Sequence, residues 1–313
     1  MNKHFSRCLL ALGLLMSGVI ALNRTDNAVA KEINIQVSPA SFEYDFDPGD
    51  TVSGEFTFVN RGDTAVTYET KAAPYQSTAD DNGGQKVDYQ TETDYTQIAK
   101  WITFSDNSKG TLAPGENVKI GFSITVPKDA PNSDKNGQYA VMLVESKTAG
   151  DQGSEGTNVA ENAGVGPIIY AKVNGNTRET AEIIKNDTDG FLFNPPITVS
   201  SIVKNTGNVH AKVSYIMRVF PFFGGESIYN NEENPSTVMV LPGSTRYYSL
   251  TWETAPPIGI YKVQSEVKIF DQVSKIEKLV IICPMWVLIL IAVFIIAVIF
   301  WIVARAKGRK TEA

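Results

Sequence analysis

Val118-Lys119-Ile120-Gly121-Phe122-Ser123-Ile124-Thr125-Val126 carries an apolar side chain at every even-numbered position. This period of two is typical of a β-strand that places one face on a core and the other in water. Residues 212–219 and 261–269 repeat the pattern, with Ser265 as the one break. Helical periodicity is nearly absent outside the two apolar ends of the chain, although residues 95–102 suit one short turn. The sequence therefore predicts an all-β fold.

A weak internal repeat divides this all-β region into two halves. Each half has a strand, an Asn-x-Gly turn and a strand, then a Pro-Gly turn into a strand, then Ala-Pro, Gly and Tyr before a last strand. The matched blocks are 56–68 with 202–215, 111–126 with 240–252, and 129–145 with 254–267. Three matched blocks in one order indicate two copies of one domain.

Turn signals spaced about 8–12 residues apart favour an immunoglobulin-like β-sandwich for each copy, while a closed barrel stays open as an alternative. We expect domain one at 31–176 and domain two at 177–278. The two tandem immunoglobulin-like domains are followed by a single transmembrane helix.

Residues 279–303, LVIICPMWVLILIAVFIIAVIFWIV, carry no charge and supply the roughly 20 apolar residues that a membrane-spanning helix needs. We predict the transmembrane helix with its extracellular approach at 279–304. Trp286 and Trp301 lie roughly 22 Å apart along a helix, which suits the two membrane interfaces. A basic tail at 305–313 follows, and its cations anchor the C-terminus in the cytoplasm: Arg305, Lys307, Arg309 and Lys310.

The N-terminus has the pattern of a secretory signal peptide. Lys3 and Arg7 precede an apolar stretch at 8–22, and Ala28-Val29-Ala30 is a small-x-small cleavage pattern. We predict a signal peptide at 1–30, cleaved after Ala30, with an uncleaved anchor as the alternative. The expected product is a single-pass protein of the cell membrane, with an extracellular N-terminal ectodomain and a cytoplasmic C-terminus.

Charge and cysteine content narrow the function of the ectodomain. Residues 31–304 hold 21 basic and 32 acidic residues, a net charge of −11, against −6 for the whole chain. This balance argues against binding to nucleic acid and to anionic lipid surfaces. Of the two cysteines, Cys8 lies in the predicted signal peptide and Cys283 at the membrane edge, so thiol catalysis and a cysteine metal site are excluded from the ectodomain.

No catalytic or metal-binding pattern stands out. His210 is the one histidine of the mature chain, and with no nucleophile motif beside it we predict a structural role. Residues 80–83 and 187–190 resemble calcium loops faintly, but both lack the full ligand spacing and are interpreted as solvated turns. We therefore expect no enzyme, no cofactor and no metal site.

Domain one contains two segments without a counterpart in domain two. Residues 146–164 are rich in Gly, Ser and Asn and are interpreted as a hairpin loop. Residues 77–97 are acidic and rich in tyrosine, a composition that resembles a recognition surface. Local packing of the loop is the alternative. The candidate binding residues are Asp80, Asp81, Tyr89 and Tyr95.

Several short motifs fall in the order expected of one family of bacterial surface proteins. They are Ser38-Pro39, Asp47-Pro48-Gly49, Val59-Asn60-Arg61-Gly62, Trp101-Ile102, Leu112-Ala113-Pro114-Gly115, Val126-Pro127-Lys128-Asp129-Ala130-Pro131 and Gly137-Gln138-Tyr139. With the signal peptide, the second sandwich and the terminal helix, the chain resembles the WxL-interacting (DUF916-containing) proteins of Gram-positive bacteria. The resemblance implies a first domain that binds peptidoglycan and a second that engages WxL proteins or host extracellular matrix.

The sequence thus predicts a non-enzymatic, membrane-anchored binding or scaffold protein of the cell surface, with peptidoglycan or a surface protein such as a WxL protein as its partner. Two alternatives stay open. One is a chaperone-like envelope assembly protein that donates or accepts a strand. The other is a cryptic envelope hydrolase, which would show a cluster of carboxylates in a deep cleft.

Overall fold

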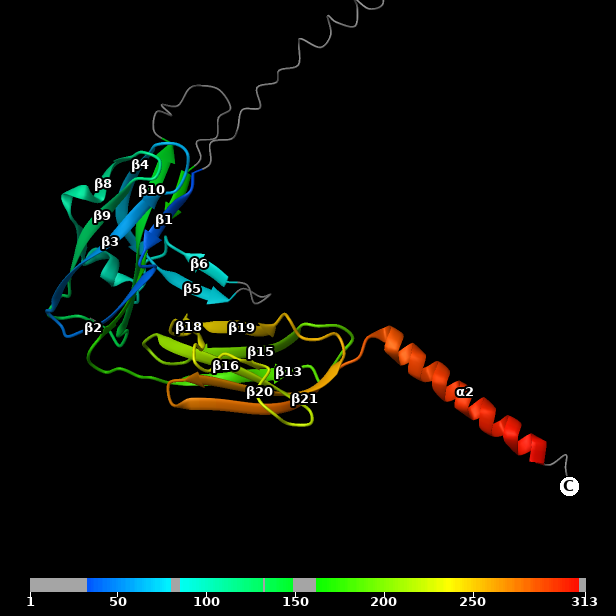
Figure 1. The fold of residues 1–313 in the computed structure, drawn as a ribbon. Coiled ribbons are helices and arrows are strands. Elements are labelled where there is room, and N and C mark those ends of the chain that lie inside the picture. The colour runs from blue at the N-terminus through cyan, green and yellow to red at the C-terminus, as the bar shows by residue number, and fades with distance from the viewer. Residues whose placement is uncertain (1–32, 80–84, 132, 149–161, 310–313) are drawn as a thin grey trace, which may run out of the picture.

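The computed structural model describes residues 33–79, 85–131, 133–148 and 162–309. The predicted signal peptide with Ala28 and Ala30, the candidate residues Asp80 and Asp81, and Lys310 lie outside these ranges. The described chain forms two β-sandwich domains set at an angle to each other, and one long helix that leaves the second domain (Figure 1). The predicted all-β fold with a C-terminal apolar helix is confirmed.

Domain one packs a four-stranded sheet against a six-stranded sheet. The four-stranded sheet has the order β1 (Ile35–Ser38), β3 (Thr51–Asn60), β9 (Asn117–Thr125) and β7 (Ile102–Phe104). The other sheet has the order β2 (Ser41–Phe46), β12 (Ile168–Val173), β10 (Gly137–Thr148), β4 (Val66–Pro74) and β8 (Lys109–Leu112), with β11 (Asn162–Val165) paired to β10. The even-numbered residues of 118–126 face this core, and Ile120 and Ile124 have no solvent exposure.

Domain two packs a three-stranded sheet against a six-stranded sheet. The smaller sheet has the order β13 (Ala181–Thr188), β15 (Ile197–Asn205) and β19 (Thr245–Trp252). The larger has the order β14 (Phe191–Leu192), β21 (Gln272–Ile282), β20 (Gly259–Ile269), β16 (Ala211–Pro221) and β17 (Tyr229–Asn230), with β18 (Ser236–Val240) also paired to β16. The boundary predicted at 176/177 lies between β12 and β13.

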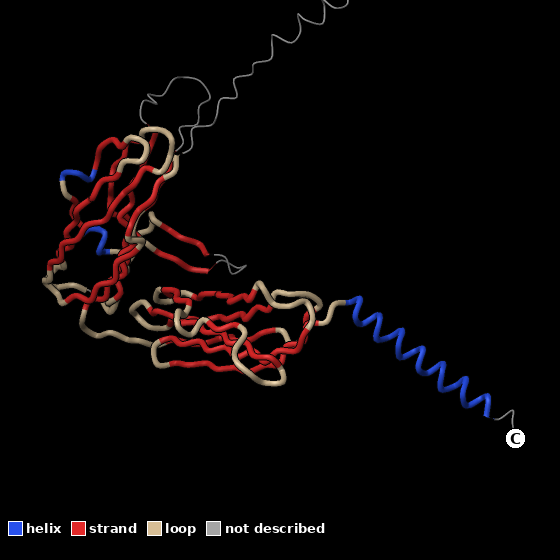
Figure 2. The backbone as a smooth tube through the Cα atoms, in the orientation of Figure 1, coloured by secondary structure: helices blue, strands red, loops and turns tan. Residues whose placement is uncertain are grey.

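A separate hairpin, β5 (Gln76–Ala79) with β6 (Gln85–Asp88), projects from domain one over domain two (Figures 1 and 2). It comes from the acidic, tyrosine-rich segment that domain two lacks. After the hairpin, the chain forms a 3-10 turn, η1 (Gln97–Lys100), within the residues where a short turn was predicted. A second 3-10 turn, η2 (Asp106–Ser108), leads into β8.

The internal repeat corresponds to one hydrogen-bond arrangement that occurs in both domains. Asn60 and Asn205 end equivalent strands and are fully buried. The Asn205 amide donates to the carbonyl oxygens of Val209 (2.8 Å) and Val240 (2.9 Å), and its Oδ1 accepts from Gly207 N (2.9 Å). Asn60 repeats the three bonds with Thr64, Leu112 and Gly62. A buried polar side chain must find such partners, so the same Asn-x-Gly sequence produces the same turn twice.

Within the segment predicted at 279–304, a strand end forms the approach and the helix follows it. Leu279–Ile282 form the end of β21, paired with β20, and helix α2 runs from Met285 to Arg309. A continuous apolar run does not distinguish a buried strand from a helix, and the β-ladder with β20 decides the matter for these four residues. Pro284 then precedes the first helical residue, where its missing N–H costs nothing.

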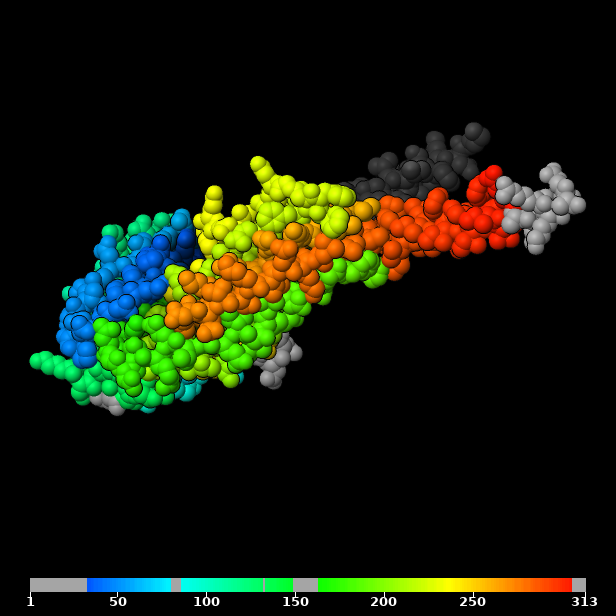
Figure 3. Space-filling view, turned by 90° about the horizontal axis from the view of Figure 1, so that it is seen from below, coloured from blue at the N-terminus to red at the C-terminus, as the bar shows by residue number. Residues whose placement is uncertain are grey.

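Helix α2 fits a single membrane span. Met285–Arg305 is long and apolar enough to cross a bilayer, and no other part of the described chain covers it. The rings of Trp286 and Trp301 are more than half exposed, and the Arg305 guanidinium lies 5.2 Å from the Trp301 ring centroid. Lys307 and Arg309 belong to the last turns of α2. Figure 3 shows the helix continuing outward from one end of the molecule.

Candidate functional site: the groove between the domains

An aromatic cluster joins the two domains. Tyr75, Tyr139 and Tyr170 of domain one are buried together with Leu241 of domain two. The Tyr139 and Tyr170 rings meet edge to face at 6.3 Å, and the Tyr75 and Tyr170 rings do so at 6.0 Å. Such contacts between buried rings favour one relative placement of the domains. We call this set the joint cluster.

His210 completes the joint from the side of domain two. Its ring lies 5.7 Å from the ring centroids of both Tyr139 and Tyr170. Burial lowers the pKa of His210 from its ordinary value of 6.5, and the carboxylates of Glu43 and Asp45 oppose that shift. The imidazole is therefore held neutral between two tyrosines. This environment gives His210 the structural place that its sequence context predicted.

Asn208 connects the domains by hydrogen bonds. Its side-chain amide donates to Asp134 O (2.7 Å), Asn136 Oδ1 (3.0 Å) and Asn176 O (2.8 Å). Its Oδ1 accepts from Arg178 N at 2.6 Å, and its backbone oxygen accepts from Gly137 N at 2.8 Å. One buried side chain thus fixes the end of domain one, the linker and the first turn of domain two.

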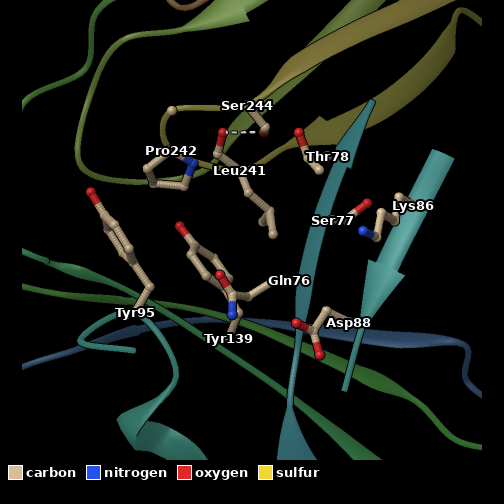
Figure 4. A pocket seen from close by; sticks show the side chains of 11 residues that line it. Gln76, Ser77, Thr78, Lys86, Asp88, Tyr95, Tyr139, Leu241, Pro242 and Ser244 are labelled. Atoms are coloured by element: carbon tan, nitrogen blue, oxygen red, sulfur yellow. Dashed lines mark hydrogen bonds between the residues drawn. The ribbon is translucent and has the colours of Figure 1, made fainter. Parts of the chain in front are cut away.

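Beside the joint cluster, the hairpin and domain two enclose a hollow of about 330 Å³ (Figure 4). One wall is the hairpin β5–β6, including Lys86 and Asp88, and the opposite wall is the turn Leu241–Ser244. Tyr95 and Tyr139 form the floor, with ring centroids 6.3 Å apart. Neither domain alone makes this hollow, so its shape depends on the joint.

A second hollow of about 460 Å³ lies on the other side of Leu241. Its lining includes Tyr75 and Tyr170 and three charged side chains, Glu43, Lys212 and Arg246. The Lys212 ammonium is 3.4 Å from Glu43. Burial raises the pKa of Tyr170 well above its ordinary value of 10, and the positive charge of Arg246 opposes that shift. Ser77 and Leu241 line both hollows, so the two adjoin between the domains, and we call them together the groove.

Strand β19 begins where this groove ends. Within the described residues it forms a β-ladder on one side only, with β15, and is the edge strand of its sheet, while the hairpin strand β5 lies close to it without forming a ladder. Asn205 N donates a hydrogen bond to Ser244 O, so these two residues form a hydrogen-bonded pair. Along an antiparallel ladder, hydrogen-bonded residue pairs alternate with non-hydrogen-bonded ones. By this register the backbone groups of Tyr247 and Ser249 point away from β15 toward the free edge. Both residues are exposed.

The sequence-predicted binding residues occupy different parts of this region. Tyr95 is half-buried on the floor of the first hollow, and its backbone oxygen accepts a hydrogen bond from Tyr139 N at 2.7 Å. Tyr89 is exposed just beyond β6, with its ring 6.2 Å from Tyr75. The structure thus connects the two tyrosines to the joint cluster. Asp80 and Asp81 lie outside the described residues.

Sequence reasoning missed the contribution of domain two to the groove. The Leu241–Ser244 segment was interpreted only as a turn entering a strand, which it is, and its place opposite the hairpin has no local signal. In the sequence, Arg246 stands among polar residues, and nothing distinguishes it from an ordinary solvent-exposed cation. Gln138 was noted only as part of a motif, yet its buried side chain positions the segment that carries Tyr95.

No group of three or more His, Cys, Asp and Glu side chains in the described part of the chain is arranged to hold a metal ion. Carboxylates do gather in a hollow beside His210, where Glu43 is paired with Lys212 and Glu179 with Lys172.

The sequence matches no protein-family profile and no curated protein. Solved structures that resemble part of the fold include the YadV chaperone (9% identity, 80% of this chain, 100% of that chain, TM-score 0.36). Others are the E. coli chaperone DraB (10%, 78% and 95%, TM-score 0.35) and the CsuC-CsuE chaperone–tip adhesion subunit complex of Acinetobacter baumannii (11%, 78% and 98%, TM-score 0.33). At these scores the similarity assigns neither family nor function.

Proposed function

We propose that this chain is a membrane-tethered, non-catalytic binding protein that accepts an extended segment of a protein partner along the free edge of β19. The observation that carries this proposal is the position of that edge. It leads directly into a groove built by both domains, with apolar and charged walls. An exposed sheet edge supplies affinity through backbone hydrogen bonds, and adjacent pockets select side chains.

The chemistry of the groove indicates what it would accept. Leu241 and the tyrosines that line the groove form an apolar surface. Lys86, Asp88 and Arg246 add charges of both signs beside it. A mixed lining of this kind fits a peptide better than it fits a uniformly polar glycan. Strand β19 itself is polar and aromatic, so of the two strand-exchange roles acceptance suits it better than donation.

The anchor places this binding surface at the envelope. With α2 as the span and the basic residues after it inside, both sandwich domains would face outward. The resemblance to WxL-interacting proteins would make the partner a WxL surface protein. Peptidoglycan as the ligand of domain one is the competing outcome of the test.

The test uses the full chain in lipid nanodiscs with a backbone change at the edge. Ser249→Pro removes an N–H that points to the free edge and leaves the bonds to β15 in place. Losing one backbone hydrogen bond should weaken partner capture about tenfold, whereas Ser249→Ala should leave it unchanged. Capture is measured from native envelope extract, together with photo-cross-linking from position 247 and, as the control, from position 268 on the opposite sheet.

Cross-links from position 247 but not 268, lost in Ser249→Pro, are the expected result. Equal capture by Ser249→Pro and Ser249→Ala would refute strand acceptance at β19. Binding to purified peptidoglycan that neither substitution alters, without any cross-linked protein, would refute the protein partner and support the wall-binding alternative.

A further inference from the structure

Three loops of domain two meet at the point where the chain enters α2. The register of the sheet brings them together. Ile282 pairs with Gly259, Tyr261 pairs with Pro221, and β14 pairs with the last two residues of β21. The loops after Asp189, after Pro221 and before Gly259 are therefore neighbours at one end of the domain. Figure 1 shows these loops at the end from which α2 leaves.

These loops expose large apolar side chains instead of covering them. Phe191, Phe193, Phe222 and Ile258 are each more than two-fifths exposed, and Phe223 is 95% exposed. We call these five residues the apolar end. Phe191 and Phe193 pack edge to face at 5.2 Å, and Phe222 and Phe223 do so at 5.1 Å. A patch of exposed aromatic rings on one end of a soluble domain marks an interaction surface.

Phe222 and Phe223 lie at the tip of a tight turn, and the backbone conformation of that turn keeps them exposed. Gly224 N donates to Pro221 O at 3.1 Å, and Gly224 and Gly225 both have positive φ angles, of 85° and 116°. Residues with side chains rarely adopt these angles, so the glycine pair closes the turn and leaves the two rings pointing outward. Phe222 N is also bonded to Ile260 O, which ties the turn to the sheet.

Charge in the same loops selects the type of partner. Residues 189–196, 222–230 and 253–260 contain Asp189, Glu226, Glu253 and no Lys or Arg. Attraction to anionic headgroups is therefore excluded as the source of binding, which leaves burial of the aromatic rings.

We propose that the apolar end of domain two is inserted into the interfacial layer of the same bilayer that α2 spans, so that domain two rests on the membrane. The apolar end lies directly beside the start of α2, and this closeness supports the assignment. Cys283 N donates to Leu192 O at 2.9 Å, between Phe191 and Phe193, and α2 begins two residues later at Met285. A bilayer that holds Met285 and Trp286 at its interface therefore reaches these phenylalanines. Aromatic side chains favour that layer.

Insertion of these loops would fix the orientation of domain two relative to the membrane. With only α2 in the bilayer, the ectodomain would pivot freely about Cys283–Pro284. With the three loops beside the helix entry also inserted, domain two has several points of contact with the membrane surface. The rigid joint then holds domain one and the groove at a set height above it. This inference concerns the membrane and does not depend on the partner proposed for β19.

The experiment measures immersion of the 221–228 loop in the full chain. A spin label on Ser227→Cys, in a chain with Cys8→Ser and Cys283→Ser, is compared with a label on Asp271→Cys in phosphatidylcholine nanodiscs. Asp271 is exposed at the opposite end of domain two, in the tight β20–β21 turn. The label at 227 should relax faster with oxygen than with a water-soluble nickel complex, and the label at 271 should show the reverse.

Replacing both rings, Phe222→Ser with Phe223→Ser, should move the label at 227 to the values found at 271. Added salt should not, because no basic group contributes. Unchanged thermal unfolding would show that the fold is intact, as expected for exposed side chains. A label at 227 that is fully open to nickel in the native loop would overturn the proposal. So would a label shielded from both relaxants, since that result indicates a protein contact instead of lipid.

Discussion

At the scale of single residues, the two buried asparagines that end β3 and β15 are the strongest determinants of each domain's turn geometry. Each satisfies two carbonyl oxygens and one N–H, all three of them buried at Asn205 and buried or partly buried at Asn60. Because an unsatisfied buried group costs about 1–3 kcal/mol, truncating either side chain affects far more than one bond.

Asn205→Ala should lower the free energy of unfolding of domain two by about 3 kcal/mol, because the carbonyls of Val209 and Val240 lose their donor. Chemical denaturation of the full chain in detergent measures this change. Asn117→Ala, at an exposed position in β9, should stay within about 0.5 kcal/mol of the wild type. A similar small change for Asn205→Ala would show that water replaces the lost bonds.

His210 makes the joint sensitive to acid. Its pKa is lowered in the folded state by burial, so the unfolded chain binds the proton more readily. Stability from the neutral imidazole is complete above pH 6.5 and is lost as the pH falls from there through the lowered pKa, with a slope of at most about 1.4 kcal/mol per pH unit.

Comparing His210→Gln with the wild type isolates this contribution, because the charged groups that act on the ring, Glu43, Asp45, Lys172 and Glu179, are present in both proteins. The free energy of unfolding should fall more steeply in the wild type between pH 7 and pH 5. Parallel pH profiles for the two proteins would contradict a neutral buried histidine.

At the scale of elements, Gln138 of β10 fixes the segment that carries Tyr95. Its Oε1 accepts from Ile98 N at 3.1 Å, and its Nε2 donates to the backbone oxygens of Asp94 at 2.6 Å and Lys135 at 3.1 Å. The 3-10 turn η1 therefore depends on a side chain of the neighbouring sheet, since so short a turn has little stability of its own.

Gln138→Leu should accelerate amide hydrogen exchange in residues 94–101 and weaken partner capture, while exchange in domain two stays unchanged. Lys100→Ala is the matched control on the same turn. It removes the exposed pair with Glu92 and a long, exposed hydrogen bond to Gln97, and exposed pairs of that kind contribute about 0–1 kcal/mol. Protection at 94–101 that survives Gln138→Leu would show that packing of Ile98 alone holds the turn.

At the scale of the whole molecule, the joint between the domains determines whether the groove has a fixed shape. The joint combines the buried aromatic cluster with the buried and partly buried hydrogen bonds of Asn208. We expect the two domains to move as one body.

Asn208→Ala should broaden the distribution of distances between spin labels placed in the two domains, because the linker and the end of domain one lose their common partner. Pulsed electron resonance measures the distribution. Lys212→Ala, which removes the exposed pair with Glu43 across the same joint, should leave it narrow. Equal widths in both variants would assign the rigidity to the aromatic cluster alone.

The sequence by itself determined the features that depend on local pattern. Alternation at 118–126 required a half-buried strand, the run up to Val303 required an apolar helix, and the repeated Asn-x-Gly blocks produced the same buried turn in each domain. Only the tertiary structure decided that Leu279–Ile282 pair as a strand, since an apolar run suits both structures.

The tertiary structure also placed Leu241 opposite the hairpin, seated His210 between two tyrosines and gathered Phe191 and Phe223 around the helix entry. These contacts join residues far apart in the chain. They follow from strand register and the angle between domains, which short-range periodicity does not encode.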